Sequence, residues 1–235
     1  MKTHYFPSPA ATNTLSTEQL REQFMIGGLF KVGEITAHYT DLDRMITGAA
    51  LPGATALTLP DAKETGTAYF LERREIGILN LGAPGVVRVG HTDHELGHLD
   101  CLYIGQGERE VTFHNGPSGQ AQFYFVSAAA HLKHPTTTVR RAEVRTDPIG
   151  DPAKANRRRI NKLIHPDGVK SCELVMGFTE FEPGSVWNSL PPHLHSRRTE
   201  IYLYFDLGDE VVFHFMGEPA ATRHLVVRDR EAVLS

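Results

Sequence analysis

Two histidines and a glutamate near the end of the chain have the types and spacing of metal ligands. His193 and His195 are one residue apart, and Glu200 follows after a short polar turn. Residues one apart on an extended segment project to the same face, so both imidazoles point the same way. The chain then resumes as a strand, on which Glu200 can return its carboxylate to the same point. Two imidazoles and one carboxylate form a ligand set for Zn²⁺, Fe²⁺ or Mn²⁺.

The same three residues allow a second interpretation without a metal. His193 and His195 would then be loop histidines, and Glu200 a solvated strand residue. The alternation after Glu200 favours the metal site, because every second residue is polar and the residues between them are apolar. The polar set, Glu200, Tyr202 and Tyr204, is expected to face a barrel interior.

A second group of histidines is expected to be structural. His91, His94 and His98 precede Asp100 within one short segment. His91 to His94 falls where we predict a hairpin turn of a first barrel. We therefore expect His98 and Asp100 to serve the turn and the barrel mouth rather than to bind a metal.

The composition excludes several classes of protein. The 235 residues are 40% hydrophobic, which is enough for a real core. Lys and Arg number 24 against 28 Asp and Glu, spread along the chain, so the sequence has no nucleic-acid footprint. It has no apolar run of about 18 residues for a membrane helix. Pro7 and Pro9 interrupt any signal-peptide core, so we predict a cytoplasmic protein. Cys101 and Cys172 are expected to be free thiols.

One helix is expected near the start, followed by a mainly β chain. Ser16 and Gln19 have capping-box spacing, and Leu15 and Leu20 have hydrophobic-staple spacing, so a short helix should run to about Met25. Short β-branched and aromatic runs then alternate with turn residues, which is typical of an antiparallel sandwich or barrel. The predicted strands are Phe30–Tyr39, Ala68–Leu71, Ile76–Leu81, Val86–Val89, Cys101–Ile104, Val111–Phe113, Gln122–Ser127, Leu174–Phe181, Thr199–Phe205, Val211–Met216 and His224–Val227.

The organisation along the chain suggests two tandem barrels. The stretch 131–165 is rich in Pro and basic residues and is interpreted as a linker. We predict an N-terminal β-barrel with its leading helix over 1–130, and a C-terminal metal-binding barrel over 166–235. The two halves share a loose strand rhythm, which fits an internal duplication.

These motifs resemble a known family. The run from His193 through His195 and Glu200 to Gly208 looks like the first metal motif of the cupin superfamily. More narrowly, the chain from Leu20 to Ser235 resembles the family of 5-keto-4-deoxyuronate isomerases, also called 4-deoxy-L-threo-5-hexosulose-uronate ketol-isomerases. The motifs that carry the resemblance are 69–75, 156–162, Trp187-Asn188 with Pro191, and 216–224.

The resemblance implies a fold, a cofactor and a reaction. It implies two cupin barrels and one Zn²⁺ per subunit, with His193, His195 and Glu200 as three ligands and Fe²⁺ or Mn²⁺ as alternative metals. It also implies a homo-oligomer that interconverts 5-dehydro-4-deoxy-D-glucuronate and 3-deoxy-D-glycero-2,5-hexodiulosonate, a step in the breakdown of pectin-derived uronates. The family's fourth ligand is a later histidine with no counterpart before Ser235. We therefore expect either a truncated second barrel or a replacement ligand, for which His214 and His224 are candidates.

Such an isomerisation removes a proton α to an aldehyde, forms an enediol and reprotonates the neighbouring carbon. A bound metal would act as a Lewis acid, and a metal-assisted hydride shift is the competing route. Tyr202 and Tyr204 are candidate proton donors, and the catalytic residues stay unassigned. Candidate partners for the substrate carboxylate are Arg197, Arg198 and the run Arg157, Arg158 and Arg159.

Two other functions remain open from the sequence. One is an Fe²⁺-dependent cupin dioxygenase with the same ligands, because a fold does not fix a function. Metal identity and oxygen consumption would separate it from the isomerase. The other is a non-enzymatic, sugar-binding two-barrel protein, which is favoured if the fourth ligand is truly absent.

Overall fold

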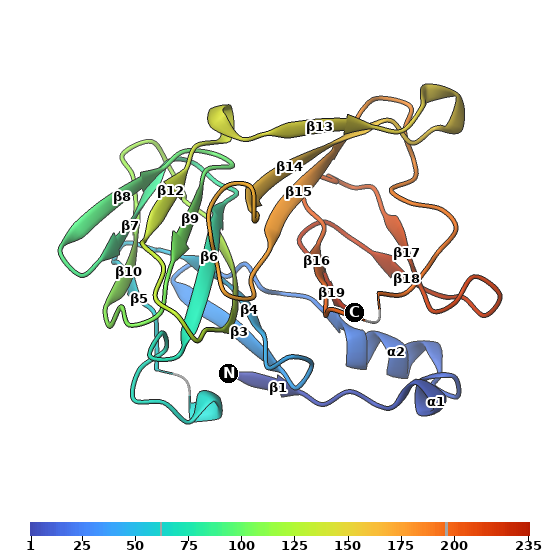
Figure 1. Cartoon of the computed structure of the whole chain (residues 1–235), viewed down its shortest axis with the longest axis horizontal. Helices are drawn as coiled ribbons and strands as arrows, with labels where there is room; N and C mark the ends of the chain where they lie inside the picture. Colours follow the sequence, from blue (N-terminus) through green and yellow to red (C-terminus); the bar gives the residue numbers. More distant parts are fainter. Residues whose placement is uncertain (62, 196) are drawn as a thin grey trace.

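The computed structural model describes residues 1–61, 63–195 and 197–235, and they form a mainly β protein, as predicted (Figure 1). The helices are α1 (Pro9–Thr12) and α2 (Thr17–Phe24), with short 3-10 turns at Lys63–Thr65, Arg141–Glu143 and Pro152–Lys154. None of the described helices is long and apolar enough to span a membrane. The strands of the N-terminal part are β1 (Lys2–His4), β2 (Met25–Ile26), β3 (Glu34–Thr40), β4 (Ile46–Leu51), β5 (Leu57–Thr58), β6 (Arg74–Asn80), β7 (Gly85–Val89), β8 (Thr92–Leu96), β9 (Cys101–Ile104), β10 (Val111–Asn115) and β11 (Phe123–Ala129). Those of the C-terminal part are β12 (Thr137–Val139), β13 (Thr146–Ile149), β14 (Arg158–Ile164), β15 (Met176–Phe181), β16 (Ile201–Leu203), β17 (Val212–Met216), β18 (Arg223–Val227) and β19 (Ala232–Leu234).

The N-terminal unit consists of two packed sheets. One has the order β1-β3-β4-β11-β6-β9-β12, and the other has the order β5-β10-β7-β8. Side chains alternate along β6, so Ile76 and Ile78 face the second sheet and pack with Val87 and Phe113. This apolar layer is the core of the unit.

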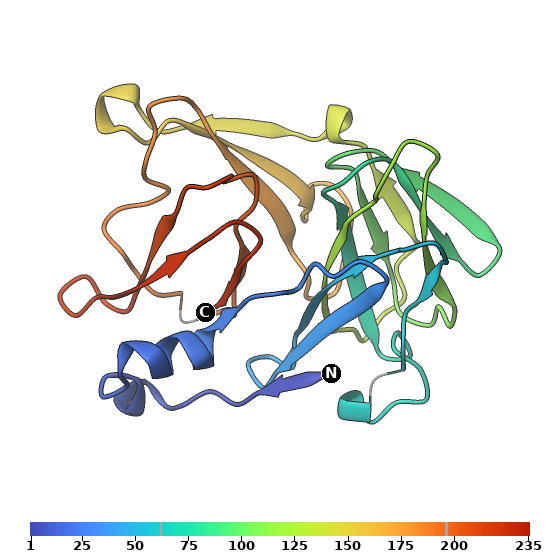
Figure 2. The same cartoon turned by 180° about the vertical axis from the view of Figure 1, so that it is seen from behind.

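The central strands of the larger sheet are buried on both faces. Every residue of β4, β6 and β9 is buried. The face opposite the first core packs against Leu163 and Met176 from β14 and β15, and against Ile26 and Ala232. Strands buried on both faces are mostly apolar rather than alternating, and β6 departs from this at Arg74, Glu75 and Asn80. Figure 2 shows β14 and β15 lying between the two ends of the molecule, where they cover this sheet.

Helix α2 has the predicted capping box, and its contacts are with the C-terminal strands. The Ser16 side chain accepts from Gln19 N, and the Gln19 side chain accepts from Ser16 N. The buried face of α2 carries Leu20 and Phe24, which pack against Leu225, Val227 and Val233. The helix therefore covers β18 and β19 (Figure 1), although the predicted boundaries place it with the first barrel. Helix α2 packs there because its apolar face, with Leu20 and Phe24, is buried against the apolar residues of β18 and β19.

The structure differs from the sequence predictions at three places. The stretch 131–165, interpreted as a linker, contains β12, β13 and β14, and β12 pairs with β9 through Thr138 and Leu102. The residues Ala68–Leu71 form turns rather than a strand. The hairpin turn predicted at His91 to His94 is confined to Gly90 and His91, because β8 begins at Thr92 and pairs with β7. The prolines and charges of 131–165 conceal short ladders that the neighbouring strands stabilise.

A buried carboxylate joins the N-terminal sheet to the C-terminal unit. Glu75 on β6 is fully buried, and its oxygens accept hydrogen bonds from Tyr103 Oη (2.7 Å) and from the backbone N atoms of Cys172 (2.8 Å), Glu173 (2.7 Å) and Leu174 (2.7 Å). Burial and the hydrogen bond to Glu75 raise the pKa of Tyr103. Among the described residues no lysine or arginine pairs with Glu75, so these four donors alone compensate its burial.

Replacing this carboxylate should destabilise the fold. In Glu75→Gln one acceptor oxygen becomes a donor that faces backbone N–H groups, so we expect a loss of about 3 kcal/mol in the free energy of unfolding. Urea unfolding followed by circular dichroism measures it. The matched control is Glu173→Gln at the neighbouring exposed residue, for which less than about 0.5 kcal/mol is expected. Equal midpoints for the two variants would contradict the assignment.

A histidine pair attaches the N-terminal strand. His4 Nε2 on β1 lies 2.9 Å from His38 Nδ1 on β3, and the parallel ladder places Lys2 opposite His38. Burial and the nearby charges of His4 and Lys2 lower the pKa of His38 to about 4, and burial also lowers that of His4. The hydrogen bond needs at least one unprotonated ring nitrogen, so the pair is built for the neutral state.

This pair predicts acid-dependent stability. Between about pH 6.5 and pH 4 the unfolded chain takes up a proton at His38 that the folded chain does not, so stability falls as the pH falls through this range. We expect wild type to lose about 2 kcal/mol more than His38→Gln between these limits. Urea unfolding of both proteins at several pH values checks this. Parallel stability curves would rule the pair out as the cause.

Candidate metal centre and polar network

The structure places the three predicted ligands near the start of β16, but not closely enough together to form a metal site. The rings of His193 and His195 lie 4.9 Å apart between centroids and are nearly perpendicular. His195 Nε2 is 3.8 Å from Glu200 Oε2. The His195 and Glu200 side chains are 34% and 24% exposed, so both remain accessible from solvent. Ser196, between the histidines and Glu200, lies outside the described residues.

The C-terminal residues fix the backbone of Glu200. Glu200 N donates to Ser235 O (2.7 Å), and Ser235 N donates to Glu200 O (2.8 Å). These bonds continue the antiparallel ladder between β16 and β19, which also pairs with β2. The segment at the end of the chain is thus a buried ladder strand at the centre of its sheet.

Arg198 is the closest cation to these ligands. Its Nη2 is 2.8 Å from Glu200 Oε1 and 3.3 Å from His195 Nε2. Within 1–61, 63–195 and 197–235, no three or more His, Cys, Asp or Glu side chains are arranged closely enough to hold a metal ion. The metal site therefore stays a prediction, supported by donor type and proximity. A cation that binds Glu200 has to displace Arg198 from one carboxylate oxygen and Tyr202 from the other.

A polar network extends inward from Glu200. Tyr202 Oη donates to Glu200 Oε2 (2.6 Å), and Tyr204 Oη lies 2.8 Å from His214 Nδ1. The rings of Tyr202 and His214 are 5.1 Å apart between centroids and meet edge to face. Glu200, Tyr202 and Tyr204 therefore share a face, as the alternation predicts. The apolar residues between them, Ile201 and Leu203, pack on the opposite side against the core between the two units.

Burial keeps this network uncharged beyond Glu200. Burial and the hydrogen bond to Glu200 raise the pKa of Tyr202, and burial raises that of Tyr204 to about 12. Burial lowers the pKa of His214 to about 4, against a smaller opposing effect of the Glu200 charge. At neutral pH both phenols keep their protons, and the imidazole is neutral.

The two histidines weighed as replacement ligands lie on opposite faces of the hairpin β17–β18. His224 packs outside between Phe213 and Phe215, at ring distances of 5.7 and 6.4 Å. His214 points inward to Tyr202 and Tyr204. Only His214 joins the network that contains Glu200. The Phe-His-Phe pattern of β17 predicts that His214 faces the opposite side from Phe213 and Phe215. It does not predict that His214 meets Tyr202 and Tyr204.

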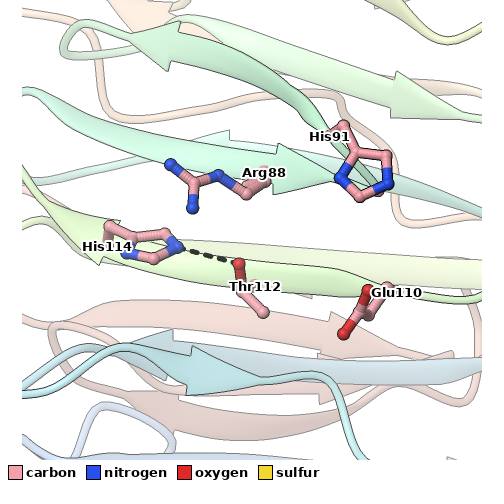
Figure 3. Close-up of a pocket in the computed structure, with 6 residues that line it drawn as sticks. Arg88, His91, Glu110, Thr112 and His114 are labelled. Atoms are coloured by element: carbon pink, nitrogen blue, oxygen red, sulfur yellow. Dashed lines mark hydrogen bonds between the residues drawn. The ribbon is translucent and has the colours of Figure 1, made fainter.

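The second histidine group is dispersed. His94 Nδ1 lies 3.2 Å from Thr138 Oγ1, and Asp100 Oδ2 accepts from Gly97 N (2.9 Å) in the turn, the role expected for Asp100. His91 lines a hollow of about 300 Å³ on the outer face of the four-stranded sheet. Figure 3 shows this hollow, which sequence reasoning missed. Its lining residues are Arg88, Gly90, His91, Glu110, Thr112 and His114.

The predicted carboxylate-binding arginines differ in their contacts. Arg157 and Arg159 both pair with Glu182, at 3.1 and 3.3 Å. Arg158 is buried and donates to Asn188 Oδ1 (2.8 Å) and Asn156 O (2.8 Å). Arg197 is exposed. Of these arginines and Arg198, only Arg198 is in contact with the predicted ligands.

The fold defines a mainly β protein and is consistent with a cupin-like fold. A solved IolB-like protein from Salmonella typhimurium matches with a TM-score of 0.62 and 14% identity over 81% of this chain and 74% of that one. A putative glyoxylate-induced protein from Pseudomonas aeruginosa matches with a TM-score of 0.52 and 10% identity over 81% of this chain and 70% of that one. Likeness at such low identity shows the fold alone.

Sequence comparison identifies the family within this class. Residues 30–234 match the KduI/IolB family, and the chain belongs to this family. A relative from Opitutus terrae is 64% identical over all of this chain and 86% of its own length. Relatives from Cereibacter sphaeroides (49% identical; 97% of this chain, 82% of the relative) and Caldicellulosiruptor bescii (46%; 100% and 86%) also match. All three are named 4-deoxy-L-threo-5-hexosulose-uronate ketol-isomerase, which confirms the resemblance inferred from the motifs.

Proposed function

We propose that this chain is a ketol-isomerase that interconverts 5-dehydro-4-deoxy-D-glucuronate and 3-deoxy-D-glycero-2,5-hexodiulosonate in the catabolism of pectin-derived uronates. The observation that carries the proposal is the 64% identity, over the whole chain, to a relative named as a ketol-isomerase of the corresponding uronate. The network from Glu200 to Tyr202, His214 and Tyr204 supports it, because it supplies proton-carrying groups beside a carboxylate.

A divalent metal, Zn²⁺ with Fe²⁺ or Mn²⁺ as alternatives, is proposed to bind His193, His195 and Glu200, one ion per subunit. The donor types support this, because the rings of His193 and His195 adjoin each other and His195 Nε2 lies 3.8 Å from Glu200 Oε2. When bound, such an ion supplies Lewis-acid polarisation of a carbonyl oxygen. Arg198, released from Glu200, would then be free to pair with the substrate carboxylate as a planar two-pronged donor.

The remaining proposals concern architecture, assembly and location. We propose two tandem barrels over 1–130 and 166–235, joined through 131–165, and a cytoplasmic homo-oligomer. Phe213 and Phe215 are 56% and 39% exposed on the outer face of the hairpin β17–β18. Two exposed aromatic rings side by side support burial in an assembly. The proposed partners are the small deoxyuronate substrate and further copies of the chain.

The ligand proposal predicts the effect of one substitution. In His195→Ala we expect bound zinc and turnover of enzymatically generated deoxyuronate to fall by at least about 100-fold, because one of the metal donors is lost. The far-UV spectrum should not change, since His195 is an exposed residue outside the strands. Metal content by mass spectrometry and an aldose–ketose assay measure both effects.

The matched control is His91→Ala, an exposed histidine on the N-terminal unit, which should keep wild-type zinc and turnover. Full activity in His195→Ala would refute the ligand assignment. If wild type consumes oxygen with bound iron and does not isomerise the deoxyuronate, the dioxygenase alternative replaces the isomerase.

A further inference from the structure

We infer that His214 is the proton-transfer residue of the isomerisation and that Tyr204 is the residue that positions its imidazole. The inference rests on the proposed function and deepens it, because it assigns the base that the resemblance to the family leaves open. Its evidence is the placement of His214 on the inner face of the hairpin β17–β18 and its contacts with two tyrosines of β16 and the segment that follows it.

His214 is the polar residue of an otherwise apolar strand. It is 8% exposed, and Phe213 and Phe215 on either side point outward. Its neighbour across the ladder is Leu225, which packs into the apolar cluster under α2. An imidazole in such surroundings costs free energy unless it is hydrogen-bonded, and its partner is Tyr204 Oη at 2.8 Å.

The position of His214 connects it with the proposed metal ligands without making it one of them. Its ring contacts the ring of Tyr202, whose hydroxyl donates to Glu200 at 2.6 Å. The order Glu200, Tyr202, His214, Tyr204 is therefore continuous in space. Of the three histidines in this region, His193 and His195 are the proposed ligands, so His214 is the imidazole left to act as a base for a substrate held beside Glu200.

Tyr204 fixes the orientation of the imidazole. One hydrogen bond at Nδ1 holds the ring plane, and Nε2 lies on the other side of the ring, away from Tyr204. When Nδ1–H donates to Tyr204 Oη, the Nε2 lone pair is free to accept a proton. Burial lowers the pKa of His214 to about 4, so the ring is neutral when the substrate arrives. The negative charge of Glu200 would stabilise the imidazolium that forms during the reaction.

The proton transfer balances without a co-reactant. The C–H bond of the hydroxyl-bearing carbon next to the aldehyde breaks, and its proton passes to Nε2 of His214. The electron pair forms the carbon–carbon double bond of an enediolate, and the former aldehyde oxygen carries the negative charge. The imidazolium returns the proton to the former aldehyde carbon, and the hydroxyl proton moves to the former aldehyde oxygen. The product is the ketone, and His214 is neutral again.

The test compares three variants of the full chain with zinc bound. In His214→Gln we expect kcat to fall by about 100- to 10,000-fold with KM within about threefold of wild type, as for loss of a general base. In Tyr204→Phe we expect kcat to fall by about tenfold with unchanged KM, because the base is retained but poorly oriented. His224→Gln, on the outer face of the same hairpin, is the control and should match wild type. Zinc content and thermal unfolding show that each variant is folded and loaded.

A second measurement uses wild type alone and does not depend on how a variant folds. Unlabelled deoxyuronate is converted in D₂O, and the product is analysed by NMR, with a blank without enzyme. Transfer through the imidazole exchanges the proton with solvent, so deuterium should appear at the former aldehyde carbon. Complete absence of deuterium there is the result expected of direct transfer between the carbons, and it would overturn the inference.

The outcomes separate this inference from the proposed function. Wild type that does not convert deoxyuronate at all removes the proposed function, and the inference falls with it. Wild type that is active while His214→Gln is folded, loaded with zinc and equally fast removes the inference alone. A parallel loss of turnover and of solvent deuterium in His214→Gln, with His224→Gln unaffected, supports both.

Discussion

The arrangement of the two β units depends on one buried carboxylate. Glu75 lies on β6, in the middle of a sheet that is covered on both faces, and it receives backbone donors from a segment that lies almost a hundred residues later, as well as the hydroxyl of Tyr103. Three consecutive N–H groups that point at one side chain fix the path of the chain between Cys172 and Leu174. Because β15 begins directly afterwards at Met176, this path sets where the hairpin of β14 and β15 lies on the N-terminal sheet.

The candidate site lies at β16, which packs against the core between the two units. The core between the units receives Ile201 and Leu203 from one face of β16, so the opposite face, with Glu200 and Tyr202, is directed toward His214. The two faces of this short strand therefore have different roles. One face makes the apolar contact that holds the units together, and the other carries the polar network. The pairing of Glu200 with Ser235 holds the first residue of this network in place.

Sequence reasoning predicted the parts of this arrangement that depend on local spacing. The capping box of Ser16 and the shared face of Glu200, Tyr202 and Tyr204 follow from residues a few positions apart. It did not predict what depends on remote partners. Strand β14 was concealed by its charged residues. The hydrogen-bond partner of His214 is Tyr204, ten residues earlier in the sequence, and the strands that helix α2 covers lie about two hundred residues after it. The burial of Glu75 likewise depends on its hydrogen bonds from the backbone of Cys172 to Leu174. The sequence around Glu75 does not predict these bonds.

The pairing of β2 with β19 has a consequence for the order of folding. Met25 and Ile26 are made well before their ladder partners, Val233 and Ala232, which lie about two hundred residues later in the sequence. Helix α2 is also made before the residues it packs against, because its apolar face contacts Leu225, Val227 and Val233. During synthesis this face stays uncovered on the ribosome while the N-terminal sheets can already form. Contacts of such large sequence separation are slow to close, so the sheet that orients Glu200 should be the last part of the described chain to become native.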